Sequence, residues 1–170
     1  MDAYQELSPK ASLYDAIPLI IQHECVLIRD ETRKICGIVT PADLSMQFQE
    51  LAEPFLLLGA IENQLRAWMA ARFTKDDLQT AKDPEDTDRQ VNDATDLTFG
   101  EYVRFLENPD NWKKLDSKID RKTFVEQLIK VRDIRNDVMH FDPDPMEPRE
   151  IEILRTFAQC LDRFDNLRVW

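Results

Sequence analysis

The chain has 170 residues and a formal net charge of −11, with 22 basic against 33 acidic side chains. This balance argues against a broad nucleic-acid-binding surface, which depends on a basic footprint, but it leaves room for a small basic cleft. Hydrophobic residues make up 43% of the sequence, so we expect one domain or two small ones with a packed core rather than disorder.

Further classes are excluded by what the sequence lacks. With three glycines it has no glycine-rich phosphate loop, and no apolar run reaches the roughly 18 residues of a membrane helix. The polar start, residues 1–7, does not resemble a signal peptide, which predicts a cytoplasmic location. Cys25, Cys36 and Cys160 are too few and too widely spaced for a disulfide framework or a zinc site, so no metal is expected. Cys25 and Cys36 lie in apolar, strand-like runs, which predicts buried free thiols.

The first fifty residues predict a small α/β unit. Ser12 is placed to cap a short helix that carries regularly spaced apolar residues as far as Ile21. Residues 25–28 and 35–39 are apolar runs across a polar turn, as in a two-stranded hairpin. Thr40 and Pro41 then open a helix, which we expect to run almost directly into another near Pro54.

From residue 53 the apolar period becomes helical. A long first helix, helices capped by Thr98 and Asp120, and a last helix from Pro148 predict a bundle of four to five helices, with Asn108–Pro109 as a break. Residues 82–96 are polar and acidic, and are expected to form a flexible loop. The predicted fold is therefore α+β and mainly α: a unit with a two-stranded sheet, residues 1–52, followed by a helical bundle, residues 53–170.

The junction of the second strand with its helix has the pattern of a phosphate site. Thr40 offers a hydroxyl beside the free amides of a helix start, which can hold a phosphate. Asp43, one turn on, can accept hydrogen bonds from ribose hydroxyls. The same two residues also fit a capping box that does no more than start the helix.

Residues 6–52 resemble a CBS motif, chiefly in the run Gly37-Ile38-Val39-Thr40-Pro41-Ala42-Asp43. The resemblance implies a sensor of adenine nucleotides such as AMP or ATP, bound through Gly37, Thr40 and Asp43. CBS motifs normally work in pairs, and this sequence contains one. A second copy is therefore expected from another chain, most simply in a homodimer, or from sequence outside this one.

A second cluster lies near the end of the helix expected after Asp120. Arg135, Asn136 and His140 stand close together, in a chain with only two histidines. An imidazole can move protons near neutral pH, and a guanidinium can clamp a phosphate. On an ideal helix Arg135 and His140 are separated by roughly 140°, so a cleft between two copies or a distorted helix end is needed to bring them together.

Residues 53–165 resemble the HEPN superfamily, through Arg135, Asn136 and His140 at the end of a bundle helix. The resemblance implies a homodimeric, metal-independent endoribonuclease of the kind that acts in stress response or phage defence. His140 would be the general acid or base, Arg135 would stabilise charge on the phosphate, Asn136 would orient either group, and a 2′,3′-cyclic phosphate would result. No cofactor is required, and an adenine nucleotide would regulate the RNA site.

Two alternatives compete with the nuclease. The bundle could be a noncatalytic nucleotide-sensing or protein-interaction module. Arg135 and His140 could also be structural, because cations in a last turn offset the negative end of a helix dipole. Nearby acids could then neutralise Arg135: Asp133, Asp137 or Asp142.

Overall fold

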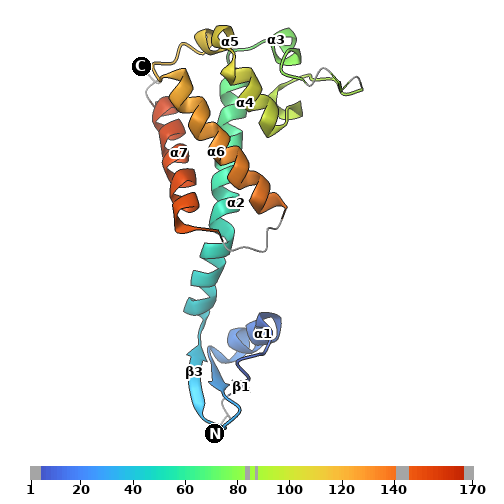
Figure 1. Ribbon diagram of the computed structural model, residues 1–170. Helices are drawn as coiled ribbons and strands as arrows, with labels where there is room; N and C mark the ends of the chain where they lie inside the picture. Colours follow the sequence, from blue (N-terminus) through green and yellow to red (C-terminus); the bar gives the residue numbers. More distant parts are fainter. Residues whose placement is uncertain (1–4, 83–84, 87, 141–145, 167–170) are drawn as a thin grey trace. The chain divides into compact units, whose positions relative to one another are not determined.

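The computed structural model describes residues 5–82, 85–86, 88–140 and 146–166. The chain is mainly α within the α+β class: a small mixed sheet comes first, and helices make up the rest (Figure 1). It divides into two compact units, Met1–Glu53 (unit 1) and Pro54–Trp170 (unit 2). No helix in the described ranges is long and apolar enough to cross a membrane.

Unit 1 is built around a three-stranded sheet and one short helix. Its elements are β1 (Glu6–Leu7), α1 (Leu13–His23), β2 (Val26–Arg29) and β3 (Ile35–Val39). The Ser12 side chain accepts a hydrogen bond from the Tyr14 amide, which confirms the predicted cap. β2 and β3 form the expected antiparallel hairpin.

The expectation of only two strands is wrong. β1 lies parallel to β2, in the strand order β1-β2-β3. A strand of two residues is too short to show an alternating pattern, so sequence periodicity gives no sign of it. An ion pair between Glu6 and Arg29 joins β1 to β2 through their side chains.

The prediction of buried thiols is also wrong for Cys36, which is exposed, while Cys25 is half-buried. Cys36 lies on β3, an edge strand on which every side chain is at least partly exposed. Its thiol donates to the carbonyl of Ile28 at 3.4 Å.

The two helices expected near Pro41 and Pro54 are one continuous helix, α2 (Pro41–Ala70), with Pro54 inside it. A proline removes one backbone donor, but the helix continues past it. The buried side chains of α2 all lie from Pro54 onward: Pro54, Leu58, Ile61, Leu65, Trp68 and Met69.

Unit 2 is helical and contains the larger core. After α2 its elements are α3 (Lys75–Gln79), the 3₁₀ turn η1 (Ala94–Asp96), α4 (Phe99–Glu107), α5 (Pro109–Lys114), α6 (Arg121–Met139) and α7 (Pro148–Asn166). Thr98 and Asp120 cap α4 and α6 as predicted. Asn108 ends α4, and Pro109 then occupies the first position of α5.

The described part of residues 82–96 is not wholly exposed to solvent. Val91 is 0% and Ala94 is 2% exposed, and both belong to the unit 2 core. Asp93 and Asp96 form a capping box around η1. Val91 and Ala94 anchor this segment in the core. The acidic residues around them give the segment the composition of a surface loop.

The centre of the core is aromatic. Phe124 of α6 contacts three other rings, with centroid distances of 5.1 to 5.9 Å: Trp68, Trp112 and Phe157. The inward stripe of α6 continues through Leu128, Val131 and Ile134, all buried. This packing fixes the rotation of α6 about its own axis, and hence the directions of Arg135 and His140.

Candidate functional site

Arg135 lies on the inward side of α6. It is four residues after the buried Val131 and seven after the buried Leu128, so helical geometry places the three on one stripe. The Arg135 side chain is half-buried. Its Nε atom is buried and has no hydrogen-bond partner among the described residues. A buried charged donor without a partner is costly and uncommon, so it marks a place where an anion would be stabilised.

Of the acids expected near Arg135, Asp142 lies outside the described residues, and neither Asp133 nor Asp137 neutralises Arg135. Asp133 pairs with Arg132 instead, accepting hydrogen bonds from its Nε at 3.0 Å and its terminal nitrogen at 2.7 Å. Asp137, the other candidate, is exposed, and no ion pair joins it to Arg135 in the described chain. The structural alternative in which either acid neutralises Arg135 is therefore not what the structure contains.

His140 is the residue that ends α6. Its backbone amide donates to the carbonyl of Asn136 at 2.9 Å, and its φ of −89° and ψ of 3° leave the helical region. The side chain is exposed, whereas that of Asn136 is half-buried. An exposed imidazole at a helix end is open to a substrate.

The helix places Asn136 one turn before His140, on the same side, but does not bring Arg135 and His140 together. α6 is regular up to Met139, so the separation of about 140° between Arg135 and His140 applies. Arg135 faces the inner side and His140 faces outward. The distorted helix end that could have joined them in one chain is absent from the described part of α6.

Thr40 and Asp43 form the reciprocal cap of α2. The Asp43 carboxylate accepts from the Thr40 amide at 2.8 Å and from its hydroxyl at 2.7 Å, and the Asp43 amide donates back to that hydroxyl at 3.4 Å. The hydrogen bond from the hydroxyl, followed by the one from the amide, lowers the pKa of Asp43. Asp43 is thus held as a carboxylate, exposed at the start of the helix.

Gly37 lies in β3 opposite Ile28. A Cβ built on Gly37 would meet the Ile28 side chain at 3.6 Å, which is ordinary contact. Glycine is therefore not demanded here by packing within the chain.

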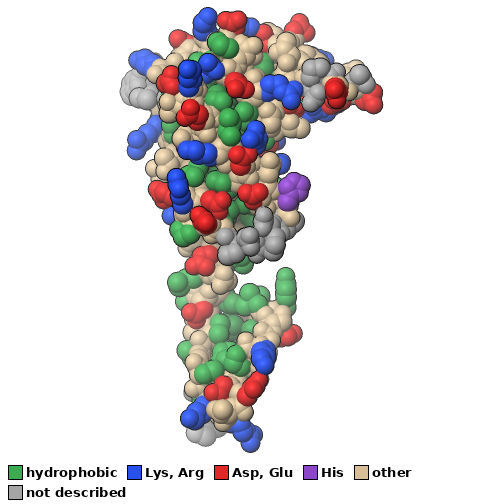
Figure 2. All heavy atoms as spheres, in the orientation of Figure 1, with side chains coloured by type: hydrophobic (Ala, Val, Ile, Leu, Met, Phe, Trp, Pro, Cys, Tyr) green, Lys and Arg blue, Asp and Glu red, His purple; other side chains and the backbone are tan. Residues whose placement is uncertain are grey.

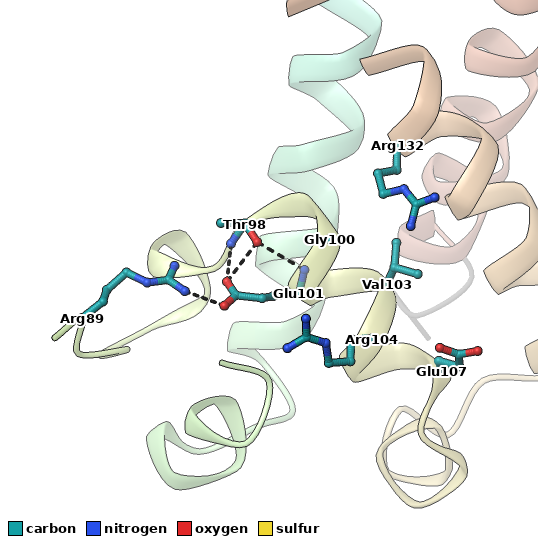
Figure 3. Close-up of a pocket in the computed structure, with 8 residues that line it drawn as sticks. All are labelled: Arg89, Thr98, Gly100, Glu101, Val103, Arg104, Glu107 and Arg132. Atoms are coloured by element: carbon teal, nitrogen blue, oxygen red, sulfur yellow. Dashed lines mark hydrogen bonds and ion pairs between the residues drawn. The ribbon is translucent and has the colours of Figure 1, made fainter. Parts of the chain in front are cut away.

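Sequence analysis missed a polar pocket of about 470 Å³ in unit 2. It is lined by residues of the segment before α4, of α4 itself and of α6 (Figure 3): Arg89, Thr98, Gly100, Glu101, Val103, Arg104, Glu107 and Arg132. The residues are spread over 44 positions from 89 to 132, and no local motif connects them. Only the packing of α4 against α6 assembles the pocket.

One side of this pocket is a structural ion pair. Glu101, 4% exposed, accepts from a terminal nitrogen of Arg89, and its other oxygen accepts from the Thr98 amide at 2.8 Å. Arg89 also donates to Asp86 at 2.8 Å and to the carbonyl of Asp96 at 2.6 Å. These contacts hold the segment before α4 in place, so the role of Arg89 is structural.

No group of three or more His, Cys, Asp or Glu side chains in the described ranges is arranged to hold a metal ion. Comparison of the chain with models of protein families, with curated proteins and with solved structures finds no match.

Proposed function

We propose that the chain is a metal-independent endoribonuclease of the HEPN type, with Arg135, Asn136 and His140 as its catalytic residues. The observation that carries the proposal is the buried Nε of Arg135, which has no hydrogen-bond partner in the part of the chain that the structure describes. In a chain with 33 acidic and 22 basic side chains, an arginine that has no carboxylate partner among the described residues favours an anion that arrives from outside. A phosphodiester is such an anion.

The chemistry needs two protein functions. The exposed His140 imidazole takes the proton of a ribose 2′-hydroxyl, whose oxygen then bonds to phosphorus while the bond from phosphorus to the 5′ oxygen breaks. A proton returned by an imidazolium or by water leaves a 5′-hydroxyl, and the other product ends in a 2′,3′-cyclic phosphate. Arg135 stabilises the charge that develops on the phosphate.

The site is completed by a second copy of the chain. Because Arg135 and His140 point about 140° apart on α6, one chain does not present both to the same phosphate. A homodimer would let each phosphate contact groups from two chains. Unit 1 offers a surface for this pairing, because several of its large hydrophobic side chains are exposed: Leu13, Tyr14, Ile21, Ile35, Ile38, Met46, Phe48 and Leu51 (Figure 2).

Regulation would come from an adenine nucleotide, AMP or ATP, at the CBS-like motif of unit 1. Thr40 and Asp43 form the reciprocal cap of α2 and place an exposed carboxylate at the start of that helix. The Asp43 oxygen that does not take part in the cap, Oδ1, would accept from ribose hydroxyls. Pairing of two motifs would supply the second half of the nucleotide site.

A noncatalytic interaction module is the second candidate. The exposed apolar side chains of unit 1 favour it, since large exposed hydrophobic patches mark binding surfaces. The two functions differ in what Arg135 binds: an RNA phosphate in the nuclease, and a carboxylate or phosphate of a partner in the module.

The test is cleavage of a labelled RNA by the purified chain in EDTA, beside Arg135→Ala and His140→Ala. The matched control is Lys130→Ala, which removes a positive charge from an exposed position on the same helix. We expect both site variants to lose at least a hundredfold in kcat/KM and the control to keep its rate. A folded wild-type chain that cuts no RNA, with or without AMP or ATP, would reject the nuclease in favour of the interaction module.

A further inference from the structure

The pocket between α4 and α6 has a basic edge formed by Arg104 and Arg132, of which Arg104 also donates to the carbonyl of Ala81 at 3.5 Å. Arg132 extends from α6 toward α4, and Arg104 lines the pocket from α4 (Figure 3). Among the described residues, the Arg132 guanidinium is paired with the side chain of the adjacent Asp133, which is itself 57% exposed. An exposed ion pair between neighbours is weak, so a doubly bonded phosphate can compete for the same guanidinium.

Arg132 lies on the same side of α6 as the outward-facing residues of the proposed catalytic site. Asn136 is four residues further along and His140 eight, so the three directions fall within about 80° of one another on the helix. Arg135, by contrast, lies on the inner stripe. A ligand that reaches His140 along the outer face of α6 therefore passes Asn136 and arrives at Arg132 and the pocket.

The separation fits a nucleic-acid strand. Eight residues of helix span about 12 Å, a length that three or four stacked nucleotides cover. The pocket volume of about 470 Å³ is large enough for a phosphate with part of its ribose. α6 also supplies the local charge, with five basic against three acidic side chains in a chain whose net charge is −11.

We infer that the pocket lined by Arg104 and Arg132 is a phosphate-binding subsite for single-stranded RNA, three or four nucleotides from the phosphodiester that is cleaved beside His140. The inference rests on the proposed ribonuclease and adds the substrate class, a single strand several nucleotides long rather than a dinucleotide. It also explains how an acidic chain could bind RNA: the contacts are limited to α6 and the pocket beside it.

The first arm of the test measures binding without cleavage. The full chain, in EDTA, is titrated into a fluorescent octanucleotide of 2′-O-methyl RNA, which has no free 2′-hydroxyl to react. We expect Arg132→Gln to weaken binding about tenfold and to reduce the dependence of log K on log salt by about one. Arg132→Lys keeps the positive charge but loses the guanidinium, which can bind a phosphate through two hydrogen bonds. Its RNA affinity should lie between those of wild type and Arg132→Gln.

The matched control is Lys130→Gln, which removes a charge of the same sign two residues away on another side of α6. It should leave the affinity within twofold of wild type. Equal weakening in Lys130→Gln and Arg132→Gln would overturn the subsite, because it would mean that only the overall charge matters. Displacement of the octanucleotide by an oligoglutamate peptide, more readily in wild type than in Arg132→Gln, would also overturn it and assign the pocket to an acidic protein segment.

The second arm separates this inference from the proposed function. The octanucleotide of ordinary RNA and a dinucleotide are cleaved in parallel, and the ratio of their kcat/KM values is compared between wild type and Arg132→Gln. We expect the preference for the octanucleotide to fall in the variant. Cleavage with an unchanged preference would reject the subsite and keep the nuclease. Binding that depends on Arg132 without any cleavage would keep the subsite and reject the nuclease.

Discussion

Unit 1 and unit 2 differ in where their hydrophobic side chains are. Unit 2 buries 27 of them in one cluster, whereas the core cluster of unit 1 has three fully buried members, Ala16, Ile20 and Val26. Of the eleven large hydrophobic side chains exposed in the described chain, eight belong to unit 1. Unit 2 therefore has the core of an independent domain, while unit 1 exposes hydrophobic side chains of the kind that a binding partner would cover.

The difference assigns different roles to the two regions. A rigid core fixes the direction of α6, so unit 2 can hold the buried Nε of Arg135 without a hydrogen-bond partner among the described residues, at a cost that a small core could not offset. Unit 1 can instead recover hydrophobic free energy by association, because burying apolar surface stabilises a complex as it stabilises a fold. We expect folding to be controlled by unit 2 and assembly by unit 1.

The largest effect is expected from a cavity in unit 2. Leu128→Ala removes a side chain that is 0% exposed from the centre of α6. We expect a loss of about 2–5 kcal/mol in the free energy of unfolding, measured by urea denaturation. Lys130→Ala on the same helix should change it by less than about 0.5 kcal/mol. A Leu128→Ala chain as stable as wild type would mean that the unit 2 core is not the stabilising element.

The buried acid of unit 2 should come second. Glu101→Gln keeps the shape but removes the charge that accepts from Arg89 and from the Thr98 amide. We expect a loss of about 1–3 kcal/mol in the same denaturation experiment, since hydrogen bonds to charged groups are the stronger ones. The equivalent change at the exposed Glu107 serves as the control. Equal effects at the two positions would contradict the structural role of the Glu101 ion pair.

Substitution on the exposed face of unit 1 should leave the fold largely intact and change assembly. Ile38 and Phe48 are 56% and 70% exposed. We expect Ile38→Ser with Phe48→Ser to change the unfolding of unit 2 by less than about 0.5 kcal/mol while shifting a concentration-dependent dimer to monomer in sedimentation velocity. A double variant that stays dimeric would show that the dimer interface does not include these two residues. A wild type that is monomeric at all concentrations would contradict the proposed dimer.

The smallest effect should be a pH dependence at the surface of unit 2. Asp77 accepts from Lys114 at 2.6 Å and caps α3 through Thr74, and these hydrogen bonds, led by that of Lys114, lower its pKa from 3.8 to about 2. A carboxyl group whose pKa is lower in the folded chain stabilises the fold at any pH above its pKa in the unfolded chain. This stabilisation is lost as the pH falls from about 4 to about 2. Asp77→Asn should therefore lower the melting temperature slightly at pH 7, and the difference should shrink over that window. A difference that persists unchanged to pH 2 would contradict this assignment.

Much of the fold could be predicted because its signals are local. Ser12, Thr98 and Asp120 cap their helices as their types and positions indicate, and the hairpin follows from two apolar runs across a polar turn. β1 and the buried Val91 could not be predicted, because each depends on contacts with residues distant in the sequence. The exposure of Cys36 has the same origin, since only the sheet order shows that β3 is an edge.

The candidate site shows the same limit. The spacing of Arg135 and His140 already predicted that they point about 140° apart, and the regular α6 agrees. The sequence could not show that Asp133 pairs with Arg132 and leaves Arg135 without a partner in the described chain, because both arginines are within reach of that acid. The pocket beside Arg132 depends on α4 packing against α6, which no motif encodes.

The central claim is that Arg135 and His140 cut RNA through the ribose 2′-hydroxyl. The most direct measurement is mass spectrometry of the ends produced from an RNA oligonucleotide in EDTA, beside the same oligonucleotide with 2′-O-methyl groups. We expect 2′,3′-cyclic phosphate and 5′-hydroxyl ends from the first, no cleavage of the second, and neither product with Arg135→Ala or His140→Ala. Intact RNA, or 5′-phosphate ends that persist in both variants, would contradict the claim.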